Sequence, residues 1–218
     1  MPQFKKRSIP PLQYIVNPKN CDYIHEVLLQ VLKAGIDWVQ LRMKDCSEQE
    51  MLNMTLEAQK LCKIFQATLI INDHVLLAKE IKADGVHLGK QDMSAEKARE
   101  KLGDNFFIGG TANTFKDIQT LAPFVNYFGL GPYKFTETKK NLSPVLGYDG
   151  FLNILTKCGK QGIYTPIVAI GGILPEDIPV LQGLGVYKYA VSSGIDTAEN
   201  ISDAVFSYQA KINYTESI

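Results

Sequence analysis

The sequence lacks the residue patterns that mark cysteine-stabilised, zinc-binding or triad-type hydrolytic proteins. Its four cysteines include no C-x-x-C pair, so their spacing favours neither a metal cluster nor a disulfide framework, and we expect four free thiols. Only three histidines are present, His25, His74 and His87, and none has the pairing that a catalytic triad or a zinc site needs. Chemistry in this chain must therefore rest on other side chains.

Net charge and long apolar runs are also missing. The 23 basic residues balance 23 acidic ones, so no global field attracts nucleic acid or an anionic membrane. No apolar stretch approaches the roughly 20 residues that a membrane span requires. Residues 1–11 include three basic residues but no apolar core of signal-peptide length. We expect a cytoplasmic protein with no nucleic-acid or membrane partner; a homo-oligomer is compatible with the sequence.

Short apolar runs recur along the chain and predict eight β-strands. Most of them end at glycines or polar residues, as buried parallel strands do. The runs are Gln13–Val16, Trp38–Leu41, Thr68–Ile71, Gly85–Leu88, Phe106–Gly109, Tyr127–Leu130, Ile167–Ile170 and Tyr187–Val191.

Most of the intervals between these runs have helical spacing. Cys21–Ala34 places apolar residues on one face, and Ser47–Glu50 has the pattern of a capping box. The other predicted helices are Asp73–Lys82, Ser94–Leu102, one beginning near Thr114, Asp149–Lys160, Pro175–Leu184 and Ala198–Ile212. Alternation of eight strands with helices predicts an α/β protein that is a single (β/α)8 TIM barrel, and the 218 residues fit the roughly 200 to 250 that one barrel needs. We expect one domain over residues 1–218, with a loose segment at 1–11 and a tail at 213–218.

Cationic and amide side chains follow the second predicted strand. Active sites of such barrels lie at the C-terminal ends of the strands. Gln40, Arg42 and Lys44 alternate along the backbone, so we expect them on one side, converging on one point. The arginine fork and the compact lysine charge suit a diphosphate; an ordinary surface pair is the alternative.

Two aspartates follow the third and fourth predicted strands. Adjacent strands lie about 5 Å apart, so Asp73 and Asp92 can converge on one hard cation such as Mg²⁺, which takes one or two carboxylates and completes its shell with water and phosphate oxygens. The alternative is that each aspartate caps the helix that follows it.

A second anion site is predicted after the seventh and eighth strands. Gly171 and Gly172 allow close backbone approach, and Ser192 and Ser193 add hydroxyl groups, at the place where these barrels commonly bind a monophosphate. Plain turn glycines are the alternative. The long loop at 133–148 adds further polar groups, and loops of this length are often functional. They include Thr136, Thr138, Lys139 and Lys140.

Several of these segments together resemble the thiamine phosphate synthase family, from about Tyr14 to Ile195. The segments are Val39–Lys44, Ile71–Asp73, Ala83–Gly89 with Asp92, Ile108–Thr111, Gly129–Pro132 with Thr136–Lys139, and Val168–Ile173. Any one of them alone is weakly specific, whereas all of them in this order are highly specific.

The resemblance implies a reaction between an aminopyrimidine methyl diphosphate and a thiazole phosphate that gives thiamine phosphate and diphosphate. It implies Mg²⁺ held by Asp73 and Asp92. The residues that it implies for the diphosphate are Gln40, Arg42, Lys44, Asn72 and Lys139. Those that it implies for the thiazole phosphate are Thr136, Thr138, Gly171, Gly172 and Ser193, to which we add Ser192. Thr111 would lie near the pyrimidine, and we expect Arg42, Lys44, Lys139 and Thr111 to be the catalytic residues.

Two positions depart from the family pattern. Asn113 stands where the family more often has histidine, and Ser192 replaces a usual aliphatic residue. The first bears on an alternative, a thiazole tautomerase of the same fold that uses that histidine for proton transfer, because an amide does no acid–base work near neutral pH. A non-catalytic paralogue that binds thiamine phosphates and regulates is the remaining alternative.

Overall fold

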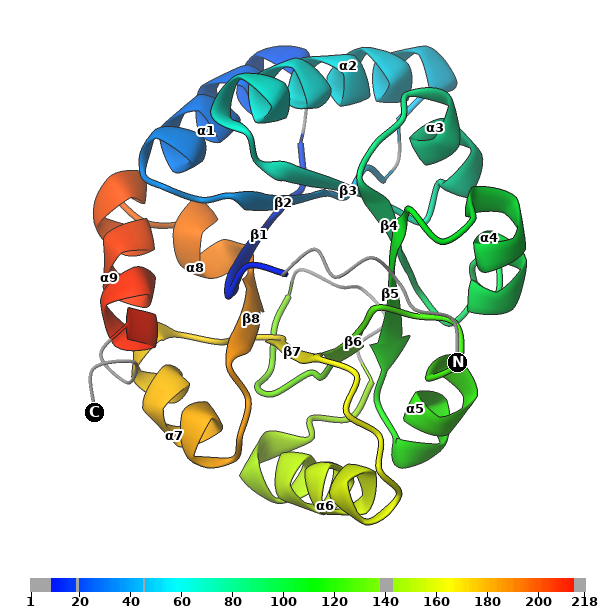
Figure 1. Ribbon diagram of the computed structural model, residues 1–218. Helices are drawn as coiled ribbons and strands as arrows, with labels where there is room; N and C mark the ends of the chain where they lie inside the picture. The colour runs from blue at the N-terminus through cyan, green and yellow to red at the C-terminus, as the bar shows by residue number, and fades with distance from the viewer. Residues whose placement is uncertain (1–8, 19, 45, 138–142, 214–218) are drawn as a thin grey trace.

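The computed structural model describes residues 9–18, 20–44, 46–137 and 143–213, and these form a closed barrel of parallel strands inside a ring of helices (Figure 1). The strands, which pair in sequence order with β8 closing onto β1, are β1 (Leu12–Val16), β2 (Trp38–Leu41), β3 (Thr68–Asn72), β4 (Gly85–Leu88), β5 (Phe107–Ala112), β6 (Tyr127–Leu130), β7 (Ile167–Ile170) and β8 (Lys188–Val191). The helices are α1 (Cys21–Lys33), α2 (Glu48–Phe65), α3 (Val75–Glu80), α4 (Ala95–Leu102), α5 (Phe115–Leu121), α6 (Gly147–Lys160), η1 (Pro175–Asp177), α7 (Ile178–Gly183), α8 (Ser193–Asp196) and α9 (Ile201–Asn213). The predicted single (β/α)8 barrel is confirmed.

The fifth strand is longer than its sequence predicted. It runs to Ala112 rather than ending at Gly109, because Gly109 and Gly110 are there for packing and do not end the strand. A Cβ atom at Gly109 would lie 2.1 Å from the Tyr127 ring and 2.5 Å from His87 Nδ1. The extension places Thr111 within the strand instead of in the loop after it.

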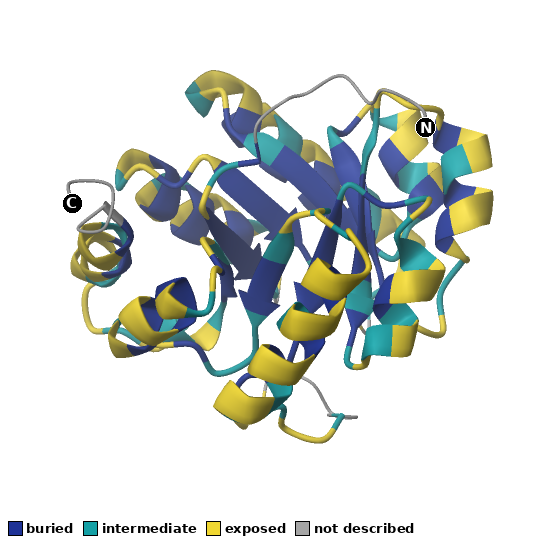
Figure 2. Cartoon of the chain, turned by 60° about the horizontal axis from the view of Figure 1, so that its bottom comes forward, coloured by how far each residue is buried: buried dark blue, intermediate teal, exposed yellow. Residues whose placement is uncertain are grey.

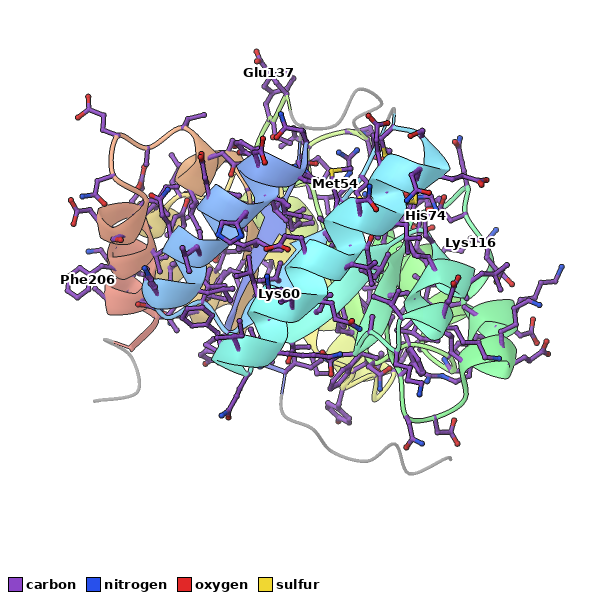
Figure 3. All side chains as sticks on the ribbon, turned by 90° about the horizontal axis from the view of Figure 1, so that it is seen from above. Met54, Lys60, His74, Lys116, Glu137 and Phe206 are labelled. Atoms are coloured by element: carbon purple, nitrogen blue, oxygen red, sulfur yellow. The ribbon has the colours of Figure 1, made fainter. Side chains whose placement is uncertain are left out.

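Helix boundaries follow local capping and apolar spacing. The capping box predicted at Ser47–Glu50 is present at the start of α2, with Ser47 Oγ accepting from the Glu50 N–H. Met54 on α2 is 2% exposed, whereas Lys60 on the same helix lies on the solvent side, and Figure 3 labels both. The same division runs round the ring, with exposed outer helix faces and buried strands (Figure 2). Because all neighbouring strands are parallel, their C-terminal ends lie at the same edge of the barrel.

Residues 9–11 are the described part of the segment that we expected to be loose, and Ile9 and the Pro11 backbone contact the barrel. Ile9 is 8% exposed and joins an apolar cluster inside the barrel. Its carbonyl oxygen accepts a hydrogen bond from Lys188 Nζ, and the Pro11 carbonyl accepts one from the Tyr189 N–H at 2.8 Å. Residues 1–8 and 214–218 lie outside the described part of the chain.

The last quarter of the barrel contains a short helix that the sequence pattern did not predict. The predicted helix Pro175–Leu184 is divided into η1 and α7, with Pro179 in the first turn of α7, where proline is tolerated. The predicted helix beginning at Ala198 starts at Ile201 instead, because α8 directly follows β8. This extra helix brings its side chains to the C-terminal edge of the barrel.

Two expectations about absent features can be compared with the structure. In the described part of the chain, none of the four cysteines forms a disulfide bond. Within the described ranges, none of the helices has both the length and the apolar character needed to cross a membrane.

A network around Asp117 begins α5 and yields a stability prediction. Asp117 Oδ2 accepts from the backbone N–H groups of Asn113 and Thr114, each at 2.9 Å, and lies 2.7 Å from Lys90 Nζ. Asp117→Ala should therefore lower the free energy of unfolding by about 1–2 kcal/mol, measured by denaturant titration. The control is Lys116→Ala, at an exposed neighbour that Figure 3 labels, and it should change the free energy of unfolding little.

The same network makes the stability difference between wild type and Asp117→Ala depend on pH. Burial favours the neutral form of Asp117, but Lys90, the Asn113 N–H and Thr114 outweigh it and lower its pKa below the ordinary 3.8. Its contribution is therefore complete above the ordinary carboxyl pKa and is lost as pH falls through the lower folded value. A stability difference between wild type and Asp117→Ala that stayed constant down to strongly acid pH would contradict this account.

Candidate active site

A cavity lies at the C-terminal ends of the strands and brings together many of the predicted site residues. Its walls come from β1, β2, β4 to β8, their following loops and α8. The predicted residues that line it are Arg42, Thr111, Thr136, Gly171, Gly172, Ser192 and Ser193. Sequence-distant strand ends thus meet round one space, as the parallel closed barrel requires.

Gln40, Arg42 and Lys44 do not converge on one point. Gln40 is 2% exposed and donates to Gln13 Oε1 at 2.8 Å inside the barrel. The Arg42 guanidinium donates to Asn17 Oδ1 at 2.8 Å and lines the cavity. Lys44 Nζ lies 2.5 Å from Asp73 Oδ2. Alternation along the backbone predicted that the three side chains lie on one side, but each of them contacts a different polar partner.

Asp73 and Asp92 lie next to each other, after β3 and β4. A hydrogen bond joins the two carboxyl groups, and Asp92 Oδ2 also accepts from the Gly89 N–H at 2.7 Å. Neither aspartate caps a helix, because the N-caps of α3 and α4 are His74 and Ser94. Asn72, 7% exposed, ends β3 immediately before this pair. The helix-capping alternative for the two aspartates is therefore wrong.

The two carboxyl groups have opposite pKa shifts. Burial, and then the hydrogen bond and charge of Asp73, raise the pKa of Asp92 to about 6. Burial also acts to raise the pKa of Asp73, but the hydrogen bond from Asp92 and the contact with Lys44 outweigh it and lower that pKa. Two adjacent carboxylates repel each other, so the pair retains a proton between them into mildly acid pH.

This donor set fits a magnesium ion. The two carboxyl groups lie beside each other, and the Lys44 ammonium group lies 2.5 Å from Asp73 Oδ2. Two carboxylates are also the usual protein contribution to a Mg²⁺ site that takes its other ligands from water and phosphate. Among the described residues, no cluster of three or more His, Cys, Asp or Glu side chains forms a metal site of another kind.

A cluster of polar side chains from β4, β5 and β6 lies next to the cavity. His87 Nε2 is 3.1 Å from Thr111 Oγ1, and His87 Nδ1 is 3.3 Å from the Tyr127 hydroxyl. The His87 and Tyr127 rings stack with centroids 5.6 Å apart. This contact aligns the imidazole edge with the Thr111 hydroxyl, and both line the cavity. His87 is 6% exposed.

The glycine pair after β7 supports the loop that follows β6. Gly171 and Gly172 have φ of 96° and 63°, which favour glycine. Added Cβ atoms would lie 2.6 Å from Pro132 Cβ and 2.6 Å from the Phe135 carbonyl oxygen, and the Lys134 N–H donates to Gly171 O at 2.8 Å. These glycines therefore do more than turn the chain, since they let two loops meet at the cavity.

Asn113 joins the same loop from β5. Its Nδ2 donates to the Gly131 carbonyl, and its Oδ1 accepts from Ser143 Oγ at 3.0 Å. Glu137, labelled in Figure 3, stands in this loop at the rim of the barrel. Thr138, Lys139 and Lys140 lie outside the described residues, so their predicted contacts stay predictions.

The loop after β8 leads directly into α8. Ser192 is the N-cap residue, and Ser192, Ser193 and Gly194 all line the cavity. The first N–H groups of a helix have no acceptor within it, so those of Ser193 and Gly194 can serve a ligand. The Ser192 hydroxyl donates to Asp196 Oδ2 at 3.0 Å and accepts from Asn17 Nδ2 at 2.9 Å.

Two residues of this site were not proposed for it from the sequence. Asn17 contacts both Arg42 and Ser192, and Ser143 contacts Asn113 at the cavity wall. Asn17 directly follows the first apolar run, so the rule that located the other strand-end residues would also have located it.

Comparison with known proteins gives a consistent result. A family model described as thiamine monophosphate synthase matches residues 12–195. The chain belongs to the thiamine monophosphate synthase family. The match spans every predicted site residue, from Gln40 to Ser193.

Curated relatives and a solved structure agree with membership of the thiamine monophosphate synthase family. A thiamine-phosphate synthase of Bacteroides fragilis is 48% identical over 186 residues, covering 84% of this chain and 91% of the relative. One from Flavobacterium johnsoniae is 44% identical over 189 residues, covering 86% and 89%. The structure of a thiamine phosphate pyrophosphorylase from Pyrococcus furiosus superimposes with a TM-score of 0.80 at 25% identity, covering 94% and 96%.

The aspartate pair yields a prediction for the metal-free protein. Asp73 has φ of 65°, a conformation that asparagine tolerates, so Asp73→Asn removes the charge with little backbone strain. The pKa of Asp92, about 6 in the wild type, should fall in this variant because a neighbouring carboxylate no longer opposes its ionisation. Carboxyl NMR titration after EDTA treatment measures it. An Asp92 pKa that stayed near 6 would show that burial alone sets the value.

Proposed function

We propose that this protein joins an aminopyrimidine methyl diphosphate to a thiazole phosphate, giving thiamine phosphate and diphosphate. As a member of the thiamine monophosphate synthase family it is a transferase. The observation that carries the proposal is one cavity lined both by Arg42, which follows β2, and by the glycines and serines that follow β7 and β8. Lys44 and the aspartate pair lie at the neighbouring strand ends.

In this proposal the diphosphate lies at the β2 to β4 edge. Arg42 offers a planar donor fork, and Lys44 a compact charge already near the carboxylates. Asp73 and Asp92 would hold Mg²⁺, which supplies positive charge to the diphosphate oxygens when bound. Lys139, in the same role, is proposed from the family pattern alone. Gln40, bonded to Gln13 below the cavity, supports this edge from inside the barrel.

The thiazole phosphate would lie across the cavity, at the β7 and β8 edge. The backbone at Gly171 and Gly172, the first turn of α8 at Ser193, and the Thr136 side chain supply donors to one phosphate. Loops after β6 and β7 are packed together there, so these donors are held in place before the substrate arrives.

The chemistry requires charge neutralisation and alignment. The bond between the methylene carbon and the diphosphate oxygen breaks, and its electron pair leaves with the diphosphate. The electron-rich pyrimidine stabilises the remaining cation, and the thiazole nitrogen donates its lone pair to form the new C–N bond. No proton has to be removed in that bond-forming step, so the site needs no general base. Thr111 and His87 would orient the pyrimidine deep in the cavity.

The tautomerase alternative is weaker because of what Asn113 does. A proton transfer needs a titratable group at that position, and Asn113 instead has its amide bonded to the loops after β6. Its role in this proposal is to hold the cavity wall.

A turnover assay tests the proposed function. Purified protein with both substrates and Mg²⁺ should release diphosphate and form thiamine phosphate, and EDTA should stop both. No product under these conditions would overturn the proposal. Ligand binding by calorimetry with no turnover would select the regulatory paralogue, whereas EDTA-insensitive aromatisation of the thiazole phosphate would select the tautomerase.

Loss of one carboxylate should slow the reaction strongly. Asp73→Asn is expected to lower kcat about 100-fold, comparable to losing one preorganised electrostatic group worth about 3 kcal/mol. A tenfold excess of Mg²⁺ should not restore the rate fully, because the ligand itself is missing. The matched control is Asp203→Asn, at an exposed residue of α9, and it should retain wild-type turnover. Unchanged turnover in Asp73→Asn would remove Asp73 from the metal site.

A further inference from the structure

A continuous chain of hydrogen bonds crosses the rim of the barrel from Arg42 to Asp196. Arg42 Nη1 donates to Asn17 Oδ1 at 2.8 Å, and Asn17 Nδ2 donates to Ser192 Oγ at 2.9 Å. Ser192 Oγ donates to Asp196 Oδ2 at 3.0 Å, and the Tyr14 hydroxyl donates to Asp196 Oδ1. The chain therefore links a cation that follows β2 to an anion on α8 through Asn17, which follows β1, and Ser192, which follows β8.

The polarity of this chain is set by its two ends. Arg42 can only donate and the Asp196 carboxylate can only accept, so the Asn17 amide has one consistent orientation. A flipped amide would turn its NH₂ group toward the Arg42 guanidinium. With Asn17 oriented in this way, the Ser192 hydroxyl accepts from the amide and sends its own hydrogen to Asp196. That hydrogen is then not available to a phosphate.

The chain is anchored in the buried part of the barrel. Tyr14 is 0% exposed and belongs to β1. β1 also pairs with β8, with Tyr14 opposite Val191, so both ends of the Asn17 contact are attached to adjoining strands. Arg42 is a long side chain with several rotatable bonds, and a fixed acceptor at Asn17 removes much of the freedom that ligand binding would otherwise have to remove.

We propose that Asn17 is a positioning residue that holds the Arg42 guanidinium toward the diphosphate, and that Ser192 acts on Arg42 through Asn17. The inference rests on the proposed function, since it assigns the diphosphate to Arg42. It gives Ser192 a role in diphosphate binding, whereas the sequence predicted a role in binding the thiazole phosphate.

Binding of inorganic diphosphate in the presence of Mg²⁺, measured by calorimetry, isolates this role. Asn17→Ala should weaken binding about tenfold, in the range for one hydrogen bond to a charged group. Steady-state kinetics should show a similar rise in KM for the aminopyrimidine diphosphate, with little change in kcat. A purely structural role would lower the active fraction and hence the apparent kcat, without moving KM.

Ser192 variants test the link through Asn17. Ser192→Ala should also weaken diphosphate binding, and Ser192→Thr, which keeps a hydroxyl, should restore much of it. The double variant Asn17→Ala/Ser192→Ala should bind diphosphate no more weakly than Asn17→Ala, because both substitutions break the same chain. Gln182→Ala removes a buried amide between α7 and α9 and is the matched control, with diphosphate affinity expected at the wild-type value.

Two results would overturn the inference: wild-type diphosphate affinity and KM in folded Asn17→Ala, or fully additive losses in the double variant. If Asn17→Ala does not fold, as judged by circular dichroism, the comparison of Ser192→Ala with Ser192→Thr decides. If the wild-type protein forms thiamine phosphate and Asn17→Ala has the same diphosphate affinity and KM, the inference is rejected and the proposed function stands. Wild-type protein without turnover would reject the proposed function instead.

Discussion

Closure of β8 onto β1 is the constraint on which the arrangement of the site depends. The two strands come from opposite ends of the chain, and their register sets Gln13 opposite Ala190 and Tyr14 opposite Val191. That register brings Asn17 and Ser192, 175 positions apart, within 2.9 Å. Every other strand end is then fixed by a parallel neighbour on each side, so the side chains that follow the strands have little freedom to move apart.

The cationic side chains at this edge of the barrel each have a polar partner. The chain as a whole has no net charge, yet Arg42 lines the cavity and Lys44 lies beside Asp73, one of the two carboxylates proposed to hold Mg²⁺. Each cation therefore has a partner when no substrate is bound: Asn17 for Arg42 and Asp73 for Lys44. Such pairing limits the desolvation cost of keeping charged groups in a partly buried site and keeps them oriented for an anionic ligand.

Much of this molecule could be predicted from the sequence because strand periodicity and strand-end chemistry are local signals. The eight apolar runs gave the strands within a few residues, apart from β5, where glycines needed for contact with Tyr127 looked like a strand end. Residue type and position also brought Asp73 and Asp92 together. The partners of Gln40, Arg42 and Lys44 could not be predicted in this way, because they depend on side chains of β1 and β3 that only the closed register brings near. The helix α8 was missed because four residues carry no apolar period.

Apolar side chains fill the interior of the barrel below the cavity. Ile9, Trp38, Tyr127 and other apolar side chains occupy its interior below the cavity, and Lys188 fastens the Ile9 backbone there. This packing fills the barrel interior beneath the cavity, which lies at the C-terminal ends of the strands. In the proposed reaction, each substrate and product would therefore enter and leave at the C-terminal edge of the strands, where Thr136 and Ser143 line the cavity.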